Sequence, residues 1–517
     1  MIRSTLSSLS LPLSLVLVAC VGGNPMVTDT GTSTDSDTDN TTTMGPTTTG
    51  PTTTGLTTMG PTTMGSTSST TTDGTTTDMT TMGTTETTGV TPDCMAADGE
   101  PDDACDAGTP FCVSGKCVDC AGANGDSSCE AVDAASPVCS DGACVECSAD
   151  NALACSGTTP VCDDASSACV GCTEHAQCGD VACNFSEGSC FSGDNVIWVN
   201  KAAEDCMVGD GTMAAPFCTV GEAFLKVAEE ENIVMPWTVR VAPGTYIEIE
   251  HLTPSTSTIA LIADGGTVTL RSTLDGAAGL ATGDASTLYL QGITLSLAQT
   301  SGLKCSASSV FITDTRLSNN SQHGVEALDC DTFHVRSLIT QNQKGGVASY
   351  GAGITRIENS FITANGNIVS EFGGVRSAQA NELEIVDSTL IGNDGDQAAS
   401  IQCIDANGGT IRNSVVIGRT NNPSVDCMGA MVSYSLVDGG DMQGEANMMA
   451  TGSDVKSWFE DAGGGIFRVL AMVDEMESPI AGVAMWVAGD PSTDYDGDPR
   501  MASEGSMEFP GADVPTP

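Results

Sequence analysis

The chain has 517 residues, with 67 Asp and Glu side chains against 17 Lys and Arg side chains. A chain with this excess of negative charge repels phosphate backbones and gains nothing from counterion release, which argues against nucleic acid as a partner. Divalent cations, neutral glycans and basic protein surfaces are compatible with the same charge.

Residues 1–19 have the composition of a secretory signal. Arg3 supplies a positive charge, and the apolar stretch from Leu6 to Ala19 is too short to span a bilayer comfortably. No other apolar run approaches the roughly 18 residues of a spanning helix. The sequence therefore predicts an exported chain that does not cross a membrane.

The end of this signal carries a recognisable motif. The segment Leu17-Val18-Ala19-Cys20 resembles the lipobox of bacterial lipoproteins. The resemblance implies cleavage before Cys20, a diacylglycerol thioether on its sulfur and acylation of the new amine, and stable anchoring does need several chains. Val21 stands where some lipoproteins carry an inner-membrane aspartate, so the outer membrane is expected. The alternative is an ordinary signal peptide with an incidental cysteine.

Residues 20–92 form a low-complexity segment. It is mostly Thr, Gly, Ser, Asp and Pro, and no Lys or Arg occurs between Ser4 and Gly115. Such a composition cannot bury enough apolar surface to offset the entropy of ordering. We expect a disordered linker that holds the folded part away from the lipid surface.

Cysteines concentrate in residues 93–192. Of the 23 cysteines, 16 lie between Cys94 and Cys190. A phrase containing Cys-x-x-Cys occurs three times, and a last group looks like a truncated fourth copy: Cys117–Cys120, Cys144–Cys147 and Cys169–Cys172, then Cys178, Cys183 and Cys190. The spacing fits zinc or redox sites as well as disulfides. Disulfides are favoured because an exported, loop-rich unit with little core needs covalent staples. The segment resembles the EGF-like or Dickkopf-type modules of bacterial surface lipoproteins, and its connectivity is left open.

Residues 193–517 contain a repeat. Four copies of Ile-x-Asp/Asn-Ser/Thr and two degenerate copies end at Thr315, Ser337, Ser360, Ser388, Ser414 and Ser435. The steps of 22, 23, 28, 26 and 21 residues follow from these positions. A period of this size indicates one supersecondary unit stacked on itself. Three short strands per period predict an all-β fold, a right-handed parallel β-helix of roughly nine coils.

Two further columns follow each phrase. The first is the asparagine series Asn320, Asn342, Asn365 and Asn393, for which we expect left-handed backbone and hydrogen bonds up and down the column. The second is a Gly-Val pair that opens the third strand, at Gly324, Gly346 and Gly374. Together they predict a corner between the second and third strands of each coil.

The ends of this region resemble a known family. Asp210–Phe217 with Val241–Tyr246 look like the entry of pectin-lyase-like β-helix proteins, which implies a cap helix at about 220–230 over the first coil. Asp494–Arg500 resembles the terminal segment of bacterial "choice-of-anchor" β-helix proteins. The fold carries lyases, hydrolases and non-catalytic binders, so the resemblance implies a fold more than an activity.

The remaining cysteines test the register of the coils. In each of two pairs, the two cysteines are separated by about one coil and occupy similar positions in their coils. The spacing of neighbouring strands permits a disulfide between such positions. We predict Cys305–Cys330 and Cys403–Cys427, with Cys206–Cys218 pinning the cap.

No catalytic residues are assigned. The arginines occupy different phases of the repeat and are not expected to converge: Arg316, Arg336, Arg356, Arg376 and Arg412. His323 lies in a Gln-His-Gly phrase that faintly resembles polygalacturonases, whose other elements are absent, and a corner role is favoured. Asp494, Asp496 and Asp498 have the alternate spacing of a calcium loop. A solvated terminal turn is favoured there because the later Glu of such loops is missing, so Ca²⁺ is a minor alternative.

These observations predict a surface-exposed, outer-membrane-anchored lipoprotein. Its β-helix is expected to act in adhesion or in recognition of a glycan or another cell-surface polymer, without catalysis. The alternatives are a polysaccharide lyase or glycoside hydrolase, and a purely structural spacer. The sequence identifies neither the ligand nor the oligomeric state.

Overall fold

The structure is a computed structural model that describes residues 93–515, except for 152–153, 231–234, 250, 406–407, 420–421 and 441–442. The expected signal segment, Cys20 and the linker to residue 92 lie outside the described residues. In the described part, no helix is long and apolar enough to cross a bilayer.

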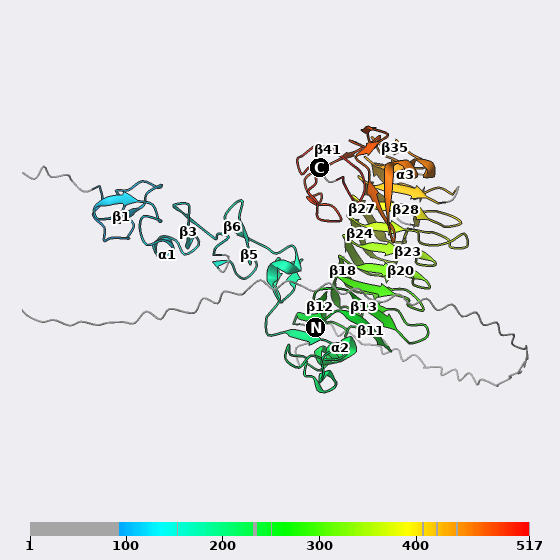
Figure 1. Cartoon of the computed structure of the whole chain (residues 1–517), viewed down its shortest axis with the longest axis horizontal. Helices are drawn as coiled ribbons and strands as arrows, with labels where there is room; N and C mark the ends of the chain where they lie inside the picture. The colour runs from blue at the N-terminus through cyan, green and yellow to red at the C-terminus, as the bar shows by residue number, and fades with distance from the viewer. Residues whose placement is uncertain are drawn as a thin grey trace, which may run out of the picture. The chain divides into compact units, whose positions relative to one another are not determined.

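The cysteine-rich region consists of four small units, each built on an antiparallel hairpin (Figure 1). The hairpins are β1 (Phe111–Val113) with β2 (Lys116–Val118), β3 (Val138–Ser140) with β4 (Ala143–Val145), β5 (Val161–Asp163) with β6 (Ala168–Val170), and β7 (Cys183–Asn184) with β8 (Ser189–Cys190). Helix α1 (Asp126–Val132) belongs to the second unit, and the 3₁₀ helix η2 (His175–Cys178) belongs to the fourth.

Every unit has the same crossed disulfide pattern, in which its first cysteine pairs with the third and its second with the fourth. The pairs are Cys94–Cys112, Cys105–Cys117, Cys120–Cys139, Cys129–Cys144, Cys147–Cys162, Cys155–Cys169, Cys172–Cys183 and Cys178–Cys190. The prediction of a truncated fourth copy is wrong, because Cys172 is the first cysteine of a complete fourth unit. Each Cys-x-x-Cys joins the end of one unit to the start of the next.

The rest of the chain winds into coils whose strands form three parallel sheets (Figure 1). The first sheet has ten strands: β9 (Val196–Val199), β10 (Trp237–Val241), β12 (Thr258–Ala263), β15 (Thr287–Gln291), β18 (Ser309–Thr313), β21 (Asp331–Val335), β24 (Gly353–Glu358), β27 (Asn381–Val386), β30 (Gly409–Arg412) and β33 (Met431–Ser433). The second also has ten: β11 (Gly244–Glu248), β13 (Val268–Ser272), β16 (Ile293–Ser296), β19 (Arg316–Ser318), β22 (Leu338–Thr340), β25 (Phe361–Thr363), β28 (Thr389–Asn393), β31 (Val415–Gly418), β34 (Leu436–Val437) and β35 (Met448–Met449). The third has seven: β14 (Leu280–Ala281), β17 (Leu303–Ser306), β20 (His323–Leu328), β23 (Gly345–Tyr350), β26 (Val375–Ala378), β29 (Ile401–Ile404) and β32 (Val425–Asp426). The predicted parallel β-helix is confirmed.

The repeated phrase forms the corner between the first and second sheets. Its Ile, as in Ile312 and Ile357, is fully buried at the end of a first-sheet strand. Its third residue is left-handed in each coil, with φ between 43° and 54°: Asp314, Arg336, Asn359, Asp387, Asn413 and Tyr434. Asp and Asn adopt this conformation more readily than other side chains, which explains their recurrence. We call these six residues the corner column.

The asparagines form a buried column between the second and third sheets. Asn320 Nδ2 donates to Asn342 Oδ1 at 2.9 Å, Asn342 Nδ2 to Asn365 Oδ1 at 2.9 Å, and Asn365 Nδ2 to Asn393 Oδ1 at 3.1 Å. The predicted bonding along the column is confirmed. The predicted left-handed backbone is wrong for these residues, because the preceding residue takes that conformation: Asn319, Gln341, Ala364 and Gly392.

A helix covers the first coil, as the family resemblance implies. Helix α2 (Val220–Glu229) begins with a capping box, in which Glu222 N donates to Thr219 Oγ1 at 3.2 Å and Thr219 N donates to Glu222 Oε2 at 3.0 Å. Its buried face contains Val220, Ala223, Phe224 and Val227 and packs against β9 and β10. Close by, the 3₁₀ helix η3 (Cys206–Val208) carries one half of the Cys206–Cys218 disulfide.

Disulfides also connect neighbouring coils. Cys305 pairs with Cys330, and Cys403 pairs with Cys427. These are the two pairs expected from the register, and Cys206–Cys218 is the pair expected at the cap. All eleven disulfides of the described residues fit a protein that folds in an oxidising compartment, which supports export.

The coils end at β35, and the chain then folds back as a C-terminal segment over residues 451–515. It contains α3 (Gly452–Trp458), β36 (Phe459–Gly463), β37 (Ile466–Val469), β38 (Met472–Val473), β39 (Met476–Glu477), β40 (Ala484–Met485) and β41 (Met507–Glu508). The segment packs its own small apolar cluster against the last coils, through Ile391, Val415 and Ile417.

Candidate functional site

Three aromatic side chains stack on the outer face of the first sheet. Tyr289, Phe311 and Phe333 are register partners on β15, β18 and β21. Their ring centroids are 4.8 and 4.7 Å apart, and both pairs of ring planes differ by 9°. Since side chains alternate along a strand, the inward neighbours fill the core while these three rings lie outside it. We call them the aromatic column.

The fourth cysteine-rich unit packs against one end of the aromatic column. Phe185 meets the Tyr289 ring edge-on at 5.3 Å and the Phe311 ring at 5.9 Å. Tyr289 Oη donates to Asn184 Oδ1 at 3.1 Å, and burial raises the pKa of Tyr289 to about 12. Phe311 and Phe333 are only partly buried, so the open end of the column is a flat apolar surface.

That surface is the floor of a cavity of about 420 Å³. One wall is the fourth cysteine-rich unit, with Thr173, Glu174, His175 and Phe185, and the other wall is the C-terminal segment at residues 489–493. The floor contains Phe311, Phe333 and Arg356, and corner-column residues Arg336 and Asn359 line the edge. The cavity therefore combines an aromatic platform on the first sheet with two walls that come from distant parts of the chain.

Charged side chains around the cavity are paired. Arg336 Nε donates to Asp314 Oδ1 at 2.9 Å, and Arg336 Nη1 lies 3.4 Å from Glu174 Oε1, which connects the corner column to the fourth unit. Arg356 contacts Glu358 beside it and Glu384 at 3.1 Å on the next strand. Burial raises the pKa of Glu358, although Arg356 opposes the shift. The expectation that the arginines do not converge is wrong for Arg336 and Arg356, which line one cavity.

The histidines near the cavity are neutral near pH 7. Burial lowers the pKa of His175 to about 4, and its Nδ1 accepts from Cys183 N at 2.9 Å. Burial likewise lowers the pKa of His334 to about 3. His323 lies elsewhere, at the start of β20, where its ring stacks on Phe372 at 5.6 Å and burial lowers its pKa to about 4.

The C-terminal wall is held by the corner column. Asn413 exchanges two hydrogen bonds of 3.1 Å with the backbone of Met485, and Asn359 Nδ2 donates to Thr493 O at 2.6 Å. Arg412 forms a two-pronged ion pair with Asp490. Thus two residues of the corner column, Asn359 and Asn413, also fix the segment that closes the cavity.

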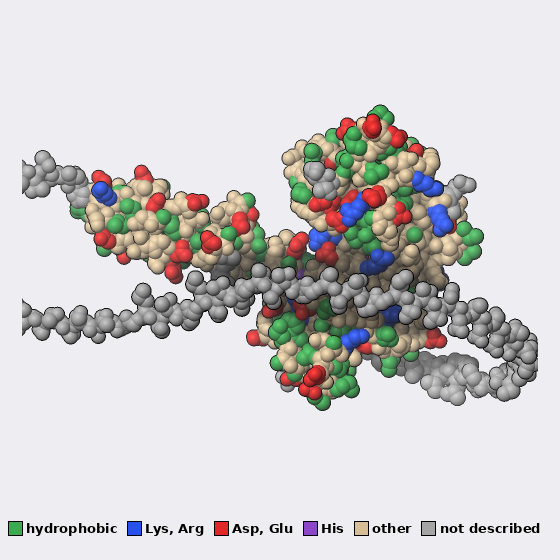
Figure 2. Space-filling model, viewed as in Figure 1, with side chains coloured by type: hydrophobic (Ala, Val, Ile, Leu, Met, Phe, Trp, Pro, Cys, Tyr) green, Lys and Arg blue, Asp and Glu red, His purple; other side chains and the backbone are tan. Residues whose placement is uncertain are grey.

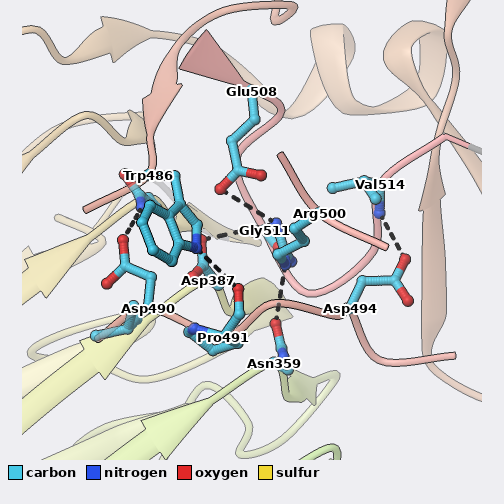
Figure 3. Close-up of polar contacts among 12 residues, drawn as sticks. Asn359, Asp387, Trp486, Asp490, Pro491, Asp494, Arg500, Glu508, Gly511 and Val514 are labelled. Carbon is cyan, nitrogen blue, oxygen red and sulfur yellow. Dashed lines mark hydrogen bonds and ion pairs between the residues drawn. The ribbon is translucent and has the colours of Figure 1, made fainter. Parts of the chain in front are cut away.

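A buried ion cluster completes this attachment (Figure 3). Arg500 is fully buried, and its Nη1 lies 3.7 Å from Asp387 Oδ1 and 3.6 Å from Glu508 Oε1. Arg500 Nε also donates to Asn359 Oδ1 at 3.2 Å. Two acids share one guanidinium, and burial raises the pKa of Asp387 to about 7 and raises that of Glu508.

Two of the three aspartates considered for calcium, Asp494 and Asp496, have separate structural roles. The buried Asp494 accepts hydrogen bonds from the backbone of Asp496 at 3.0 Å, Asp498 at 2.8 Å and Val514 at 3.0 Å. Asp496 instead pairs with Arg468 at 2.5 Å. The favoured solvated turn is wrong for Asp494, because its buried carboxylate organises the chain end. Among the described residues, groups of three spaced as metal ligands occur only where disulfide-bonded cysteines take part.

The aromatic column was missed in the sequence, although a signal exists. Tyr289, Phe311 and Phe333 are spaced by 22 residues, the period of those coils, in a chain with only 4% aromatic residues. Nothing in the sequence indicates the cavity walls, because they depend on packing of the fourth unit and the C-terminal segment. On the face visible in Figure 2, Lys and Arg side chains are scattered, with Asp and Glu side chains among them.

Comparison with a family model agrees with this fold. A family model described as right handed beta helix region matches residues 262–437, and one described as family of unknown function (DUF8331) matches residues 67–196. Among solved structures, pectate lyase Pel9A is similar at 14% identity and TM-score 0.38, over 61% of this chain and 98% of that chain. The pectin methylesterase from Aspergillus niger, in deglycosylated form, is similar at 15% identity and TM-score 0.29, over 50% and 87%. No curated protein matches the chain. The coils form a right-handed parallel β-helix.

Proposed function

We propose that this protein recognises a polysaccharide, without turning it over, in the cavity on the first sheet. The observation that carries the proposal is the aromatic platform of Phe311 and Phe333 beside polar side chains. Ligand sites combine apolar and aromatic surface with a few polar groups that fix orientation. A sugar ring offers an apolar C–H face to such a ring and hydroxyl groups to residues such as Arg336 and Asn359.

Replacing Phe333 with Ala is expected to weaken binding at least about tenfold, because the open end of the platform is lost. The intact chain is screened on an array of neutral and acidic polysaccharides, and calorimetry then gives the Kd of the strongest binder. Met431→Ala is the matched control, since Met431 is exposed at the same register position on β33, away from the cavity. Equal affinity for both variants would exclude the aromatic column as the binding surface.

A second candidate function is cleavage of the same polymer. Glu358 lines the cavity, and burial raises its pKa, as expected of a general acid. Assays for new reducing ends and for unsaturated products on the polysaccharide that binds separate the two functions. Turnover abolished by Glu358→Gln would replace recognition with catalysis, and absence of both binding and turnover would favour a structural spacer.

We also propose that the chain is an outer-membrane lipoprotein that displays the β-helix at the cell surface through Cys20. The proposal rests on the motif Leu17–Cys20 and on the many disulfides, which fit export. Labelled palmitate is expected in the wild-type chain and at background level in Cys20→Ser. Cys94→Ser, which leaves the motif intact, should retain the label. Equal labelling of the wild type and Cys20→Ser would exclude this anchor.

A further inference from the structure

A second cavity lies on the third sheet, where one coil is longer than its neighbours. From Asn342 to Val347 the corner takes five residues, and the corresponding corner from Asn365 to Val375 takes ten. The longer corner, residues 366–374, forms a loop beside a cavity of about 480 Å³. We call it the inserted loop.

The inserted loop is fixed rather than loosely attached. Asn367 Nδ2 and Ser370 Oγ donate to Gln343 O at 2.7 and 3.1 Å, which secures one side. The Phe372 side chain is 2% exposed and lies over Gly345, where a Cβ atom would approach the ring to 2.6 Å. A glycine at this β-strand position thus leaves room for the ring, and the cavity is preformed.

Phe372 in turn positions a buried cation at the cavity. The Arg376 guanidinium lies 4.6 Å from the Phe372 ring centroid, and Arg376 is only 6% exposed. Its Nε and Nη2 donate to Gln402 Oε1 at 2.9 and 2.7 Å, but Nη1 has a single long contact, 3.5 Å to Tyr350 Oη. The Nε and Nη2 side of the guanidinium is therefore held in place, whereas Nη1 can still donate a hydrogen bond to a ligand.

The charges at this cavity favour an anion. Arg376 and Lys344 line it, and within the described part of the chain the Lys344 ammonium group forms no ion pair or hydrogen bond. The opposing acid is Glu371, which contacts Arg376 Nη2 with a side chain that is 61% exposed. An exposed partner compensates a buried cation weakly. The cavity thus has two cationic side chains and one acidic side chain, although the whole chain has a net charge of −50.

We propose that this cavity binds the carboxylate of a hydroxylated acid, such as a uronate sugar. The carboxylate pairs with Arg376 Nη1 and Lys344, and hydroxyl groups of the ligand meet Asn367 and Ser321 at the rim. Glu371 occupies the guanidinium in the ligand-free state and competes with the incoming acid. The site is independent of the aromatic column, because it lies on another sheet.

Saturation-transfer NMR with sodium glucuronate on the full chain tests this site. Transfer is expected to glucuronate and not to glucose, and Lys344→Gln is expected to raise the Kd about three- to tenfold. Lys304→Gln is the matched control, since Lys304 lies on the same sheet but outside the cavity. Phe333→Ala should leave glucuronate binding unchanged, which separates this site from the first cavity.

The direction in which Glu371→Gln changes the affinity for glucuronate decides between competition and a purely structural role for Glu371. If a ligand acid competes with Glu371, removal of that charge tightens glucuronate binding; if the ion pair only pins the loop, binding does not improve. A hyaluronan hexasaccharide in the same assay distinguishes a free sugar acid from a polymer residue, because a polymer site binds it more tightly than the monomer. Equal transfer to glucose and glucuronate, no transfer at all, or unchanged or weaker glucuronate binding by Glu371→Gln would overturn the proposal.

Discussion

Replacement of Asn342 with Leu is expected to lower the free energy of unfolding by about 3–5 kcal/mol. Asn342 Nδ2 donates to Asn365 Oδ1 at 2.9 Å and to Leu317 O at 3.1 Å, and its Oδ1 accepts from Asn320 Nδ2 at 2.9 Å. Leucine makes none of these bonds, so buried amides on both neighbouring coils lose partners in a dry interior. Urea unfolding followed by circular dichroism measures the loss.

The neighbouring residue provides a matched control. Gln341 is exposed and left-handed, with φ 58°, so Gln341→Gly should change the free energy of unfolding by no more than about 0.5 kcal/mol. Gln341→Val places a β-branched side chain in that conformation and should destabilise by about 1–2 kcal/mol. Equal stability of Asn342→Leu and Gln341→Gly would contradict a structural role for the asparagine column.

Replacement of Arg500 with Met is expected to detach the C-terminal segment, at a cost of about 3–5 kcal/mol. The change leaves Asp387 and Glu508 buried without a cation and removes the bond to Asn359. Limited proteolysis should then cleave residues 451–515 while the coils stay protected. Adding Asp387→Asn and Glu508→Gln to Arg500→Met should restore much of the protection, because no uncompensated charge is left. Unchanged protection of the single variant would contradict this account.

The same cluster makes attachment dependent on pH. The pKa of Asp387 is raised to about 7 in the folded chain, against about 3.9 in an unfolded chain. The folded state therefore holds a proton that the unfolded state releases. The stabilisation is complete below about pH 4 and is lost as the pH rises to about 7. Hydrogen exchange of β40 and β41 across this range should show the trend, and Asp387→Asn should flatten it.

The sequence predicted the coils well because their determinants are local and repeated. The phrase with the buried Ile and the asparagine of the column each occur once in every coil that carries them, and each cysteine pair is spaced by about one coil. A parallel stack converts that period directly into register. The strand order and bonding along the asparagine column follow from counting alone. The left-handed conformation was predicted one position too late, because Asn tolerates it well. In the structure the residue before each asparagine is left-handed, and the asparagine side chain forms the column.

The candidate cavity on the first sheet could not be predicted to the same extent. Its floor is periodic, and the 22-residue spacing of Phe311 and Phe333 was available as a signal. Its walls come from Glu174 and from residues 489–493, which are far away in sequence and have no repeat to place them. The arginines seemed scattered for the same reason. The position of a residue within the repeat does not show which part of the coils is covered by a segment that lies outside the repeat.

The attachment of the C-terminal segment to the corner column limits how the solenoid can change in length. The segment contacts Asn359, Asp387 and Asn413, which turn three consecutive coils. The folded segment therefore sets the distance between its contact points on these coils. Loss or duplication of a whole coil within that stretch would change the distance between these contact points. The segment could then no longer make all of its contacts, even if the altered stack of coils were itself well packed. The same segment also contacts the coil of Arg316, whose Nη2 donates to Gly464 O at 3.2 Å. Only coils nearer the cap helix than that one lie outside the stretch spanned by the segment, so evolution and engineering have more freedom to alter their number there.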